Sequence, residues 1–264
     1  MELPWSQAWA SLAVLAVVMA VAWQVLGRLG RRGHVDLLWG VAIGIQAAIY
    51  ATIAPGWGPR RIAVATVAGF WALRLAWHLA QRLGRDGEDG RYLAMEEAAG
   101  ERKELFFFGF FQLQALAAWI FALPFLALVQ DATPSWRAAE IAGLALWVVA
   151  LLGNGLADRQ LDRWRRDPAN RGVTCRAGMW GWSRHPNYFF EWLLWCAYPV
   201  AAIGTPQLWL NVGVAAFMYL MITRVSGIPF TEQQALRSRG DDYRDYQATT
   251  SSFFPLPPRH VAHD

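Results

Sequence analysis

Seven apolar runs follow one another along the chain, at about 8–26, 35–54, 62–80, 105–130, 138–157, 187–203 and 207–223. Most of them approach the roughly 20 residues that a helix needs to cross the hydrocarbon core of a membrane. Pro124 interrupts the fourth run, which we expect to form one kinked helix. The pattern predicts an all-α polytopic membrane bundle of seven transmembrane helices, forming a single integral membrane domain over residues 1–264.

Composition agrees with this pattern, because 55% of the 264 residues are apolar and the 17% that are charged lie in clusters between the runs. Residues 1–27 have neither a basic start nor a clear small-residue cleavage site. We therefore expect the first helix to be retained and not removed as a signal peptide.

The basic residues give an orientation. Of the 24 Lys and Arg residues, 20 fall in the segments after the first, third, fifth and seventh runs, whereas Arg60, Arg61 and Arg137 fall on the opposite side and Arg74 lies inside the third run. Basic residues gather on the cytoplasmic side of membrane proteins, which predicts an N-terminus outside and a C-terminus in the cytoplasm. The net charge of +4 is thus a sign of topology, and we expect no nucleic-acid partner.

The two cysteines offer little chemistry. Cys175 falls in a segment expected in the cytoplasm and Cys196 in a membrane helix, which is a poor setting for a disulfide. Neither has further ligands nearby in the sequence, so we expect no metal site.

The richest stretch runs from Ser183 into the sixth apolar run. Pro186 suits the first turn of a helix, and Asn187 and Glu191 then fall four residues apart on one helix face. A carboxylate inside a membrane helix is costly and is by default a candidate functional group. Arg184, His185 and Tyr188 crowd the same helix start. The alternative is a capped transmembrane helix whose Glu simply pairs with a neighbour.

A second polar stretch ends the fifth run. Asn154, Asp158, Asp162 and Arg165 recur at spacings that place them on one side of a helix, and Arg171 and Arg176 follow. Hydrogen-bonding groups at membrane depth with arginines at the water surface suit a ligand that has an amide or sugar end and a phosphate end. A solvated charged face is the simpler alternative.

The first half carries fewer candidates. Asp36 opens the second run, where it can act as a helix-start residue as readily as a chemical group, and Tyr50 lies further along the same run. Arg74 and His78 share a face of the third run, with Asp36 as the expected ion-pair partner of Arg74. The tail from Thr231, rich in Tyr, Arg and Asp, suggests either a lid over the cytoplasmic mouth or a loose tail.

Taken together, Asn154-x3-Asp158, Arg165, Ser183-Arg-His-Pro-Asn187-Tyr-Phe-Phe-Glu191 and Tyr243-x2-Tyr246 with Phe253-Phe-Pro carry a resemblance. Over roughly residues 140–258 the chain resembles bacterial membrane proteins related to steroid 5α-reductases. That resemblance implies a seven-helix fold in the bacterial inner membrane, with an NADPH pocket open to the cytoplasm. It implies cofactor roles for Asn154, Asp158, Arg165, Asn187 and Glu191. With the neighbouring motif residues, the expected NADPH site comprises Asn154, Asp158, Arg165, Arg171, Arg176, Arg184, His185, Asn187, Tyr188, Glu191 and Tyr243.

The activity that the resemblance implies is NADPH-dependent reduction of a conjugated carbon–carbon double bond in a steroid-like or other lipidic enone that arrives from the bilayer. Steroid reductases of this kind polarise the substrate ketone with a Glu in the second helix and a Tyr in the third, and neither has a clear match here. From the sequence, Asp36, Tyr50 and His78 are the candidate catalytic donors. No partner protein is expected.

A rival interpretation stays open. Arg184-His-Pro-Asn-Tyr188, Glu232 and Gly240-Asp-Asp-Tyr243-Arg-Asp-Tyr246 are also similar to membrane methyltransferases of the isoprenylcysteine type, which use S-adenosylmethionine. The arginine-rich stretch 159–184 favours the reductase, because S-adenosylmethionine has no phosphate. A transporter is less favoured, since the sequence shows no inverted repeat.

Overall fold

The computed structural model describes residues 3–86 and 90–259, and the part of the chain that it describes is built from helices and contains no strand. By the density of its internal packing the chain divides into two compact units, Met1–Trp136 and Arg137–Asp264.

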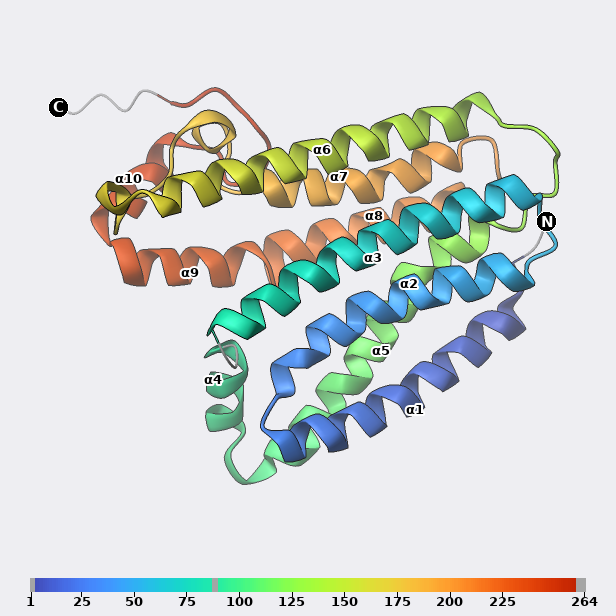
Figure 1. Cartoon of the computed structure of the whole chain (residues 1–264), viewed down its shortest axis with the longest axis horizontal. Coiled ribbons are helices and arrows are strands. Elements are labelled where there is room, and N and C mark those ends of the chain that lie inside the picture. The colour runs from blue at the N-terminus through green and yellow to red at the C-terminus, as the bar shows by residue number, and fades with distance from the viewer. Residues whose placement is uncertain (1–2, 87–89, 260–264) are drawn as a thin grey trace. The chain divides into compact units, whose positions relative to one another are not determined.

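Four long helices and one short one form the first unit (Figure 1). Helix α1 packs against α5, while α2 packs against both α3 and α5. Short 3-10 turns at Arg32–His34 and Gly100–Arg102 lead into α2 and α5. The helices are α1 (Trp5–Leu29), α2 (Val35–Ile53), α3 (Gly58–Asp86), α4 (Gly90–Ala99) and α5 (Lys103–Leu128).

Glycines set the distance between α2 and α3. A Cβ atom placed on Gly44 would lie 2.6 Å from the Cβ of Ala72, and one placed on Gly40 would lie 2.9 Å from Cδ2 of Leu75. Small residues at such positions allow membrane helices to approach closely where lipid gives no hydrophobic drive for association.

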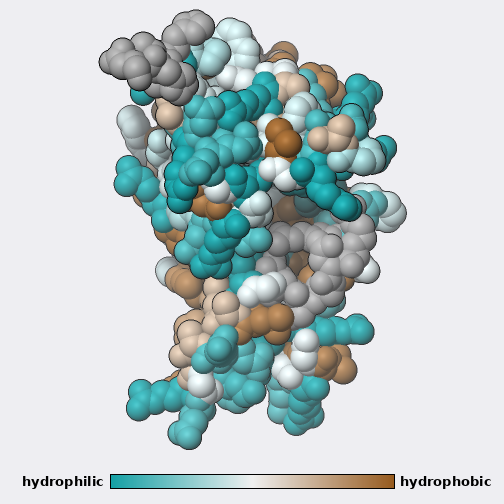
Figure 2. Space-filling model, turned by 90° about the vertical axis from the view of Figure 1, so that its left-hand side faces the viewer, coloured by the Kyte–Doolittle hydropathy of each residue, from teal (hydrophilic) through white to brown (hydrophobic). Residues whose placement is uncertain are grey.

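The second unit contains the long helix α6 (Ala138–Arg166) and the shorter helices α7 (Pro186–Ala201) and α8 (Leu208–Leu220). After α8 come a π-helical turn (Met221–Val225), α9 (Ile228–Arg239) and α10 (Asp241–Thr249). Helix α6 packs along α7, and α7 packs on α8 (Figure 1). Figure 2 looks onto the end of this unit where α9 and α10 lie, and hydrophilic side chains gather there.

The close approach of α6 and α7 again depends on glycine. A Cβ atom on Gly153 would lie 2.4 Å from Cδ1 of Phe190, and one on Gly143 would lie 2.8 Å from the carbonyl oxygen of Ala197. The backbones are therefore near enough for polar side chains of α6 to reach those of α7.

Within residues 3–86 and 90–259, six segments are long and apolar enough to cross a membrane, and they contain α1, α2, α3, α5, α6 and α8. The protein is thus a multi-pass membrane protein built from helices. All seven predicted runs correspond to helices, and Pro124 lies inside the single helix α5 as expected. The seventh span would be α7, which at 16 residues is shorter than the usual length. Seven spans and their orientation remain predictions.

Three helices were not predicted, namely α4, α9 and α10. All three are short and largely polar, so they lack the long apolar run by which the other helices were identified. The idea of a loose tail is wrong, because Ser251, Phe253 and Leu256 are hydrogen-bonded to residues 182–184, just before α7.

Candidate functional site

The segment before α7 is fastened to α6. Gly178 adopts a left-handed φ of 59°, and a Cβ atom there would lie 2.7 Å from the side chain of Gln160. Gln160 in turn accepts a hydrogen bond from the backbone N–H of Met179 (2.9 Å), and the Trp180 indole donates to the carbonyl of Ala157 (3.0 Å). The start of α7 is thereby held beside the last turns of α6.

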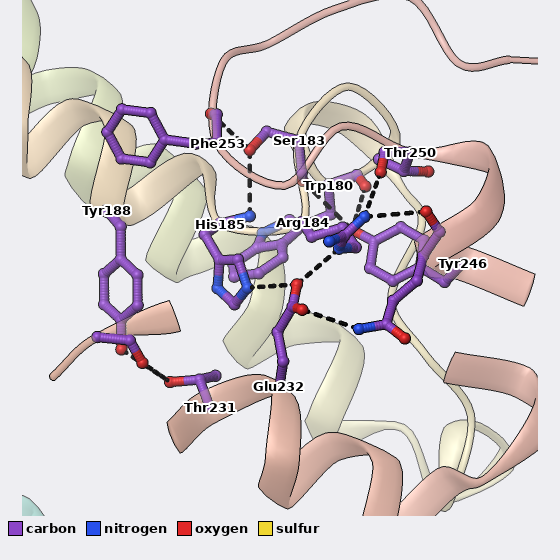
Figure 3. Close-up of polar contacts among 12 residues, drawn as sticks. Trp180, Ser183, Arg184, His185, Tyr188, Thr231, Glu232, Tyr246, Thr250 and Phe253 are labelled. Atoms are coloured by element: carbon purple, nitrogen blue, oxygen red, sulfur yellow. Dashed lines mark hydrogen bonds and ion pairs between the residues drawn. The ribbon is translucent and has the colours of Figure 1, made fainter. Parts of the chain in front are cut away.

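Arg184 and Glu232 form the centre of a polar cluster at this point (Figure 3). Nε of Arg184 donates to Oε1 of Glu232 (2.7 Å), and its Nη1 donates to the carbonyls of Gln247 (3.0 Å) and Thr250 (2.6 Å). The same Glu232 carboxylate lies 3.2 Å from Nε2 of His185 and accepts a bond from the Gln247 amide (2.8 Å). We call Arg184, His185, Glu232 and Gln247 the Arg184 cluster; its charges are paired internally.

His185 is the most enclosed member of the cluster. Its side chain is buried, and its ring stacks on that of Tyr188 with the centroids 5.4 Å apart. Burial lowers the pKa of His185 below its ordinary value, against the opposing effect of the Glu232 carboxylate. The ring is therefore neutral near pH 7, and its Nε2 carries the hydrogen that the carboxylate accepts.

The tail of the chain is tied to the same segment. Ser183 Oγ donates to the carbonyl of Phe253 (2.8 Å), and the Arg184 N–H donates to the carbonyl of Ser251 (2.8 Å). The buried hydroxyl of Tyr246 donates to the carbonyl of Trp180 (2.5 Å). Burial raises the pKa of Tyr246, so this hydroxyl keeps its hydrogen. Hydrogen bonds therefore hold the tail against the segment before α7.

A second set of polar residues joins α6 to α7 at membrane depth. Nδ2 of Asn154 donates to Oε2 of Glu191 (3.0 Å) and to the carbonyl of Asn187 (3.2 Å), and Nδ2 of Asn187 donates to Oδ1 of Asp158 (3.2 Å). We call these four residues the amide network. The structure therefore brings together four residues that the sequence predicted on two separate helices. The hydrogen bond from Asn154 also agrees with the alternative interpretation, in which Glu191 simply pairs with a neighbouring helix.

The predicted arginines divide into two groups. Arg176 pairs with Asp242 (3.1 Å) and Asp245 (2.8 Å), and Arg184 belongs to the cluster above, so both already have carboxylate partners. Arg165 and Arg171 are exposed at the end of α6 and in the loop after it. Thr174 and Arg176 lower the pKa of Asp242 even though its burial acts in the opposite direction, and so this pairing is ionic.

Tyr243, the last expected cofactor residue, is buried under α9. It packs against Ala235 and Tyr246, and the Arg239 guanidinium lies 5.0 Å from its ring centroid. Burial raises the pKa of Tyr243. Tyr243 therefore packs in a small hydrophobic core and also lies next to Arg184 and Glu232 of the Arg184 cluster.

The three candidate donors of the first unit do not meet. Asp36 begins α2, whereas the buried Tyr50 lies 14 residues later on the same helix, about 21 Å away at 1.5 Å per residue, and its hydroxyl is 2.6 Å from Oγ of Ser11. His78 is exposed on α3. A shared site of all three is excluded by this spacing along α2.

Asp36 has a different partner from the one expected. Its carboxylate accepts a bond from Tyr92 (2.7 Å) and pairs with Arg91 (3.0 Å), so the predicted pairing of Asp36 with Arg74 is wrong. Tyr92 is buried against Phe107 and Phe110 and is a further candidate donor. From the sequence, Arg91 and Tyr92 are only possible ligand contacts in a glycine-rich segment, and their contact with Asp36 follows from the fold.

Within the two described ranges, no three His, Cys, Asp or Glu side chains gather as they would around a metal ion. Burial raises the pKa of the Cys175 thiol, which also lies inside the fold.

Comparison with known proteins places the chain in a family. A family model described as a protein of unknown function, DUF1295, matches residues 22–250. The uncharacterized protein C594.04c of Schizosaccharomyces pombe is 24% identical over 262 residues, which cover 89% of this chain and 76% of the yeast protein. No solved structure matches. Because the family model spans most of the sequence, including both helices of the amide network and the Arg184 cluster, the chain belongs to the DUF1295 family.

Proposed function

We propose that the protein is an NADPH-dependent membrane reductase of a conjugated carbon–carbon double bond in a steroid-like or other lipidic enone. The observation that carries the proposal is the amide network, in which Asn154, Asp158, Asn187 and Glu191 hold one another across α6 and α7. Polar groups at this depth are expensive in a membrane protein unless they serve a ligand or a partner. The resemblance to steroid 5α-reductase relatives rests in part on the same four residues.

The network fits the nicotinamide end of the cofactor. A carboxamide presents one acceptor and two donors, and the network offers the complementary pair, amide N–H groups beside carboxylate oxygens. The side chain of Asn154 is fixed by bonds to two groups of α7, one of them the Glu191 carboxylate, and this supports a role in orienting such a ligand. These residues would bind and orient the reactive ring, while the bound cofactor supplies hydride.

The exposed arginines fit the phosphates. Arg165 follows Asn154 by 11 residues on α6, about 16 Å along the helix axis, and Arg171 lies in the loop beyond. A ligand that contacts the amide network and these arginines must be extended, with an anionic end at the water surface, as a dinucleotide is. Their guanidinium groups can bind phosphate bidentately.

The substrate requires a hydrogen-bond donor for its carbonyl oxygen. When hydride adds to the β-carbon of an enone, negative charge develops on that oxygen, and a proton must then reach the α-carbon. In the first unit the Tyr92 hydroxyl, held on Asp36, is the donor whose neighbours suit this task best. Tyr50 and His78 remain candidates from the sequence. An apolar substrate would arrive sideways from the bilayer, consistent with a multi-pass protein.

We further propose that the N-terminus faces outward and the C-terminus the cytoplasm of a bacterial inner membrane. The three arginines assigned to the outer side are all engaged with backbone carbonyls: Arg60 with residues 131–135, Arg61 with the end of α2, and Arg137 with the end of α7. These three arginines have structural roles on that side. Their position therefore does not weaken the orientation that the other 20 basic residues predict. Activity of a cytoplasm-only reporter at residue 1, with none at residue 264, would reverse the assignment.

The second candidate function is methyl transfer from S-adenosylmethionine. The observation in its favour is that the motif residues it shares with isoprenylcysteine-type methyltransferases, Arg184, His185, Glu232 and Tyr246, lie in one place. Against it, these residues bond mainly to one another and to the docked tail. We therefore rank the reductase first.

The deciding experiment offers the purified protein NADPH deuterated at the transferred position together with a 3-oxo-4-ene steroid, and follows the product by mass spectrometry. A reductase gives a saturated product that carries one deuterium. Methyl transfer from labelled S-adenosylmethionine to a lipidic thiol, without deuterium transfer to any enone lipid tried, would establish the rival function. Ligand-dependent stabilisation by NADPH or S-adenosylmethionine gives an independent measure of which cofactor binds.

A further inference from the structure

An apolar groove of about 400 Å³ lies between α7 and α8, and none of the residues that line it belongs to the Arg184 cluster or the amide network. One wall consists of Trp192, Cys196 and Pro199 of α7, and the other consists mainly of Val212, Ala216 and Tyr219 of α8. Each set recurs at the three- and four-residue spacing of a single helix face. The groove presents only apolar surface, and its volume is within the range of small-molecule sites.

The groove is open because small side chains stand between large fixed ones. Cys196 and Ala216 face it at mid-length, where larger residues would close it. The Trp192 indole cannot swing into the space freely, because its Nε1 donates to the carbonyl of Ala215 (3.1 Å). Pro199 lies inside α7 and further limits how α7 can adapt.

The tail closes one end of the groove. Phe254 lines it and packs edge-on against Trp192, with the ring centroids 5.9 Å apart. The neighbouring Phe253 is buried between Trp192 and Tyr219, and the N–H of Leu256 donates to the carbonyl of Trp182 (3.0 Å). The tail therefore forms a fixed wall at this end of the groove, next to the end of α8.

A charged residue lies just beyond that wall. Residues Met221–Val225 form a π-helical turn, in which the N–H of Ser226 donates to the carbonyl of Met221 five residues earlier. Arg224 follows Tyr219 by five residues, about 7 Å along the helix axis, and stands next to Thr223, whose Oγ1 donates to the carbonyl of Tyr219 (2.7 Å). Arg224 is exposed.

We propose that this groove holds one acyl chain of an anionic phospholipid whose phosphate binds Arg224. The groove lies on a helix that is long and apolar enough to span a membrane, so the molecules available to fill it are hydrocarbon chains. The positive charge at the end of the helix selects among lipids those with a negative head group. This lipid is distinct from the proposed reductase substrate, and the inference stands whether or not the protein is a reductase.

Native mass spectrometry tests the selection. The full-length protein, purified in a mild detergent, is titrated with phosphatidylglycerol or phosphatidylcholine, and bound lipids are counted. We expect one phosphatidylglycerol to bind about fivefold more tightly than phosphatidylcholine, and Arg224→Gln to remove that preference. Arg237→Gln, at an exposed arginine of α9, is the matched control and should keep it.

Filling the groove tests the place of binding. Ala216→Trp should abolish the bound lipid, whereas Ala145→Trp, at an exposed alanine of α6, should leave it. In a Cys175→Ser background, phosphatidylglycerol should also slow the alkylation of Cys196 by a small maleimide. The proposal is overturned if Ala216→Trp and Ala145→Trp bind lipid equally, if head-group preference survives Arg224→Gln, or if an enone steroid displaces the lipid from Cys196.

Discussion

The Arg184 cluster and the amide network draw on the same short stretch, residues 183–191, yet they are bonded in different ways. In the cluster, a full positive charge meets a full negative charge, and Arg184 also donates to the carbonyls of Gln247 and Thr250 near the end of the chain. In the amide network, neutral amides stand next to carboxylates, and the hydrogen bonds from Asn154 and Asn187 join two adjacent helices. A paired charge tied to distant chain segments holds the fold together. An amide that links two neighbours can exchange those bonds for bonds to a ligand at little cost.

The comparison suggests that one motif serves two purposes. Its first half, up to His185, fastens α7, α9 and the tail, while its second half, from Asn187, faces α6 and is suited to binding. The division makes separate predictions for stability and for ligand affinity, and each can be tested with a matched variant elsewhere in the chain.

The largest expected effect is on stability, at Glu232. Glu232→Ala leaves the Arg184 guanidinium without its counter-charge in a largely buried setting, which costs about 3 kcal/mol. For a chain of this size the midpoint of thermal unfolding should fall by about 6–12 °C. Asp241→Ala, which removes the exposed partner of Arg244, should change it by about 2 °C or less. Unchanged stability together with lost cofactor binding would assign Glu232 to the binding site.

The next effect is on affinity, at Asn154. Asn154→Ala removes the donor to Glu191, and the loss of such a charge-assisted bond should weaken NADPH binding by about ten- to a hundredfold. The control is Asn211→Ala in α8, where an equally buried Asn donates to the carbonyl of Gln207 in its own helix. Both variants should lose similar stability, but only the first should lose affinity, as measured by cofactor fluorescence. Equal affinities would remove the amide network from the proposed site.

A smaller effect on affinity is expected at the phosphate end. Arg171→Ala should weaken NADPH binding by about tenfold and make the remaining binding less sensitive to salt, because one exposed ion contact is lost. Arg176→Ala is the informative comparison, since its guanidinium is paired with Asp242 and Asp245 and its loss should act on stability first. An Arg171→Ala protein that binds NADPH as the parent does would place the phosphates elsewhere.

These same residues show how much of the fold and of the candidate site can be predicted from the sequence. The spacing of Asn154 and Asp158, and of Asn187 and Glu191, sufficed to put each pair on a helix face, because helical periodicity is local. The spacing does not show which helix faces contact each other. For this reason the sequence predicts a pairing of Asp36 with Arg74, whereas Asp36 binds Arg91 and Tyr92. Glu232 lies 48 residues beyond Arg184, and only the fold brings them together. The seven apolar runs can be predicted because each contains many apolar residues in succession. Helices α4, α9 and α10 are short and have no such run.

The smallest effect distinguishes the cluster from the network by its response to pH. Burial lowers the pKa of His185 below its ordinary value of about 6.5, and the unfolded chain therefore binds a proton more readily than the folded protein does. The stability associated with a neutral His185 is present above about pH 6.5 and is lost as the pH falls below it, by at most about 1.4 kcal/mol per pH unit. His185→Gln should flatten this decline in a series of unfolding midpoints, while His78→Gln, at an exposed position, should follow the parent curve. If both variants track the parent, protonation of His185 does not limit the cluster, and a decline that steepens in His185→Gln would mean that the ring is charged and paired with Glu232 in the folded state.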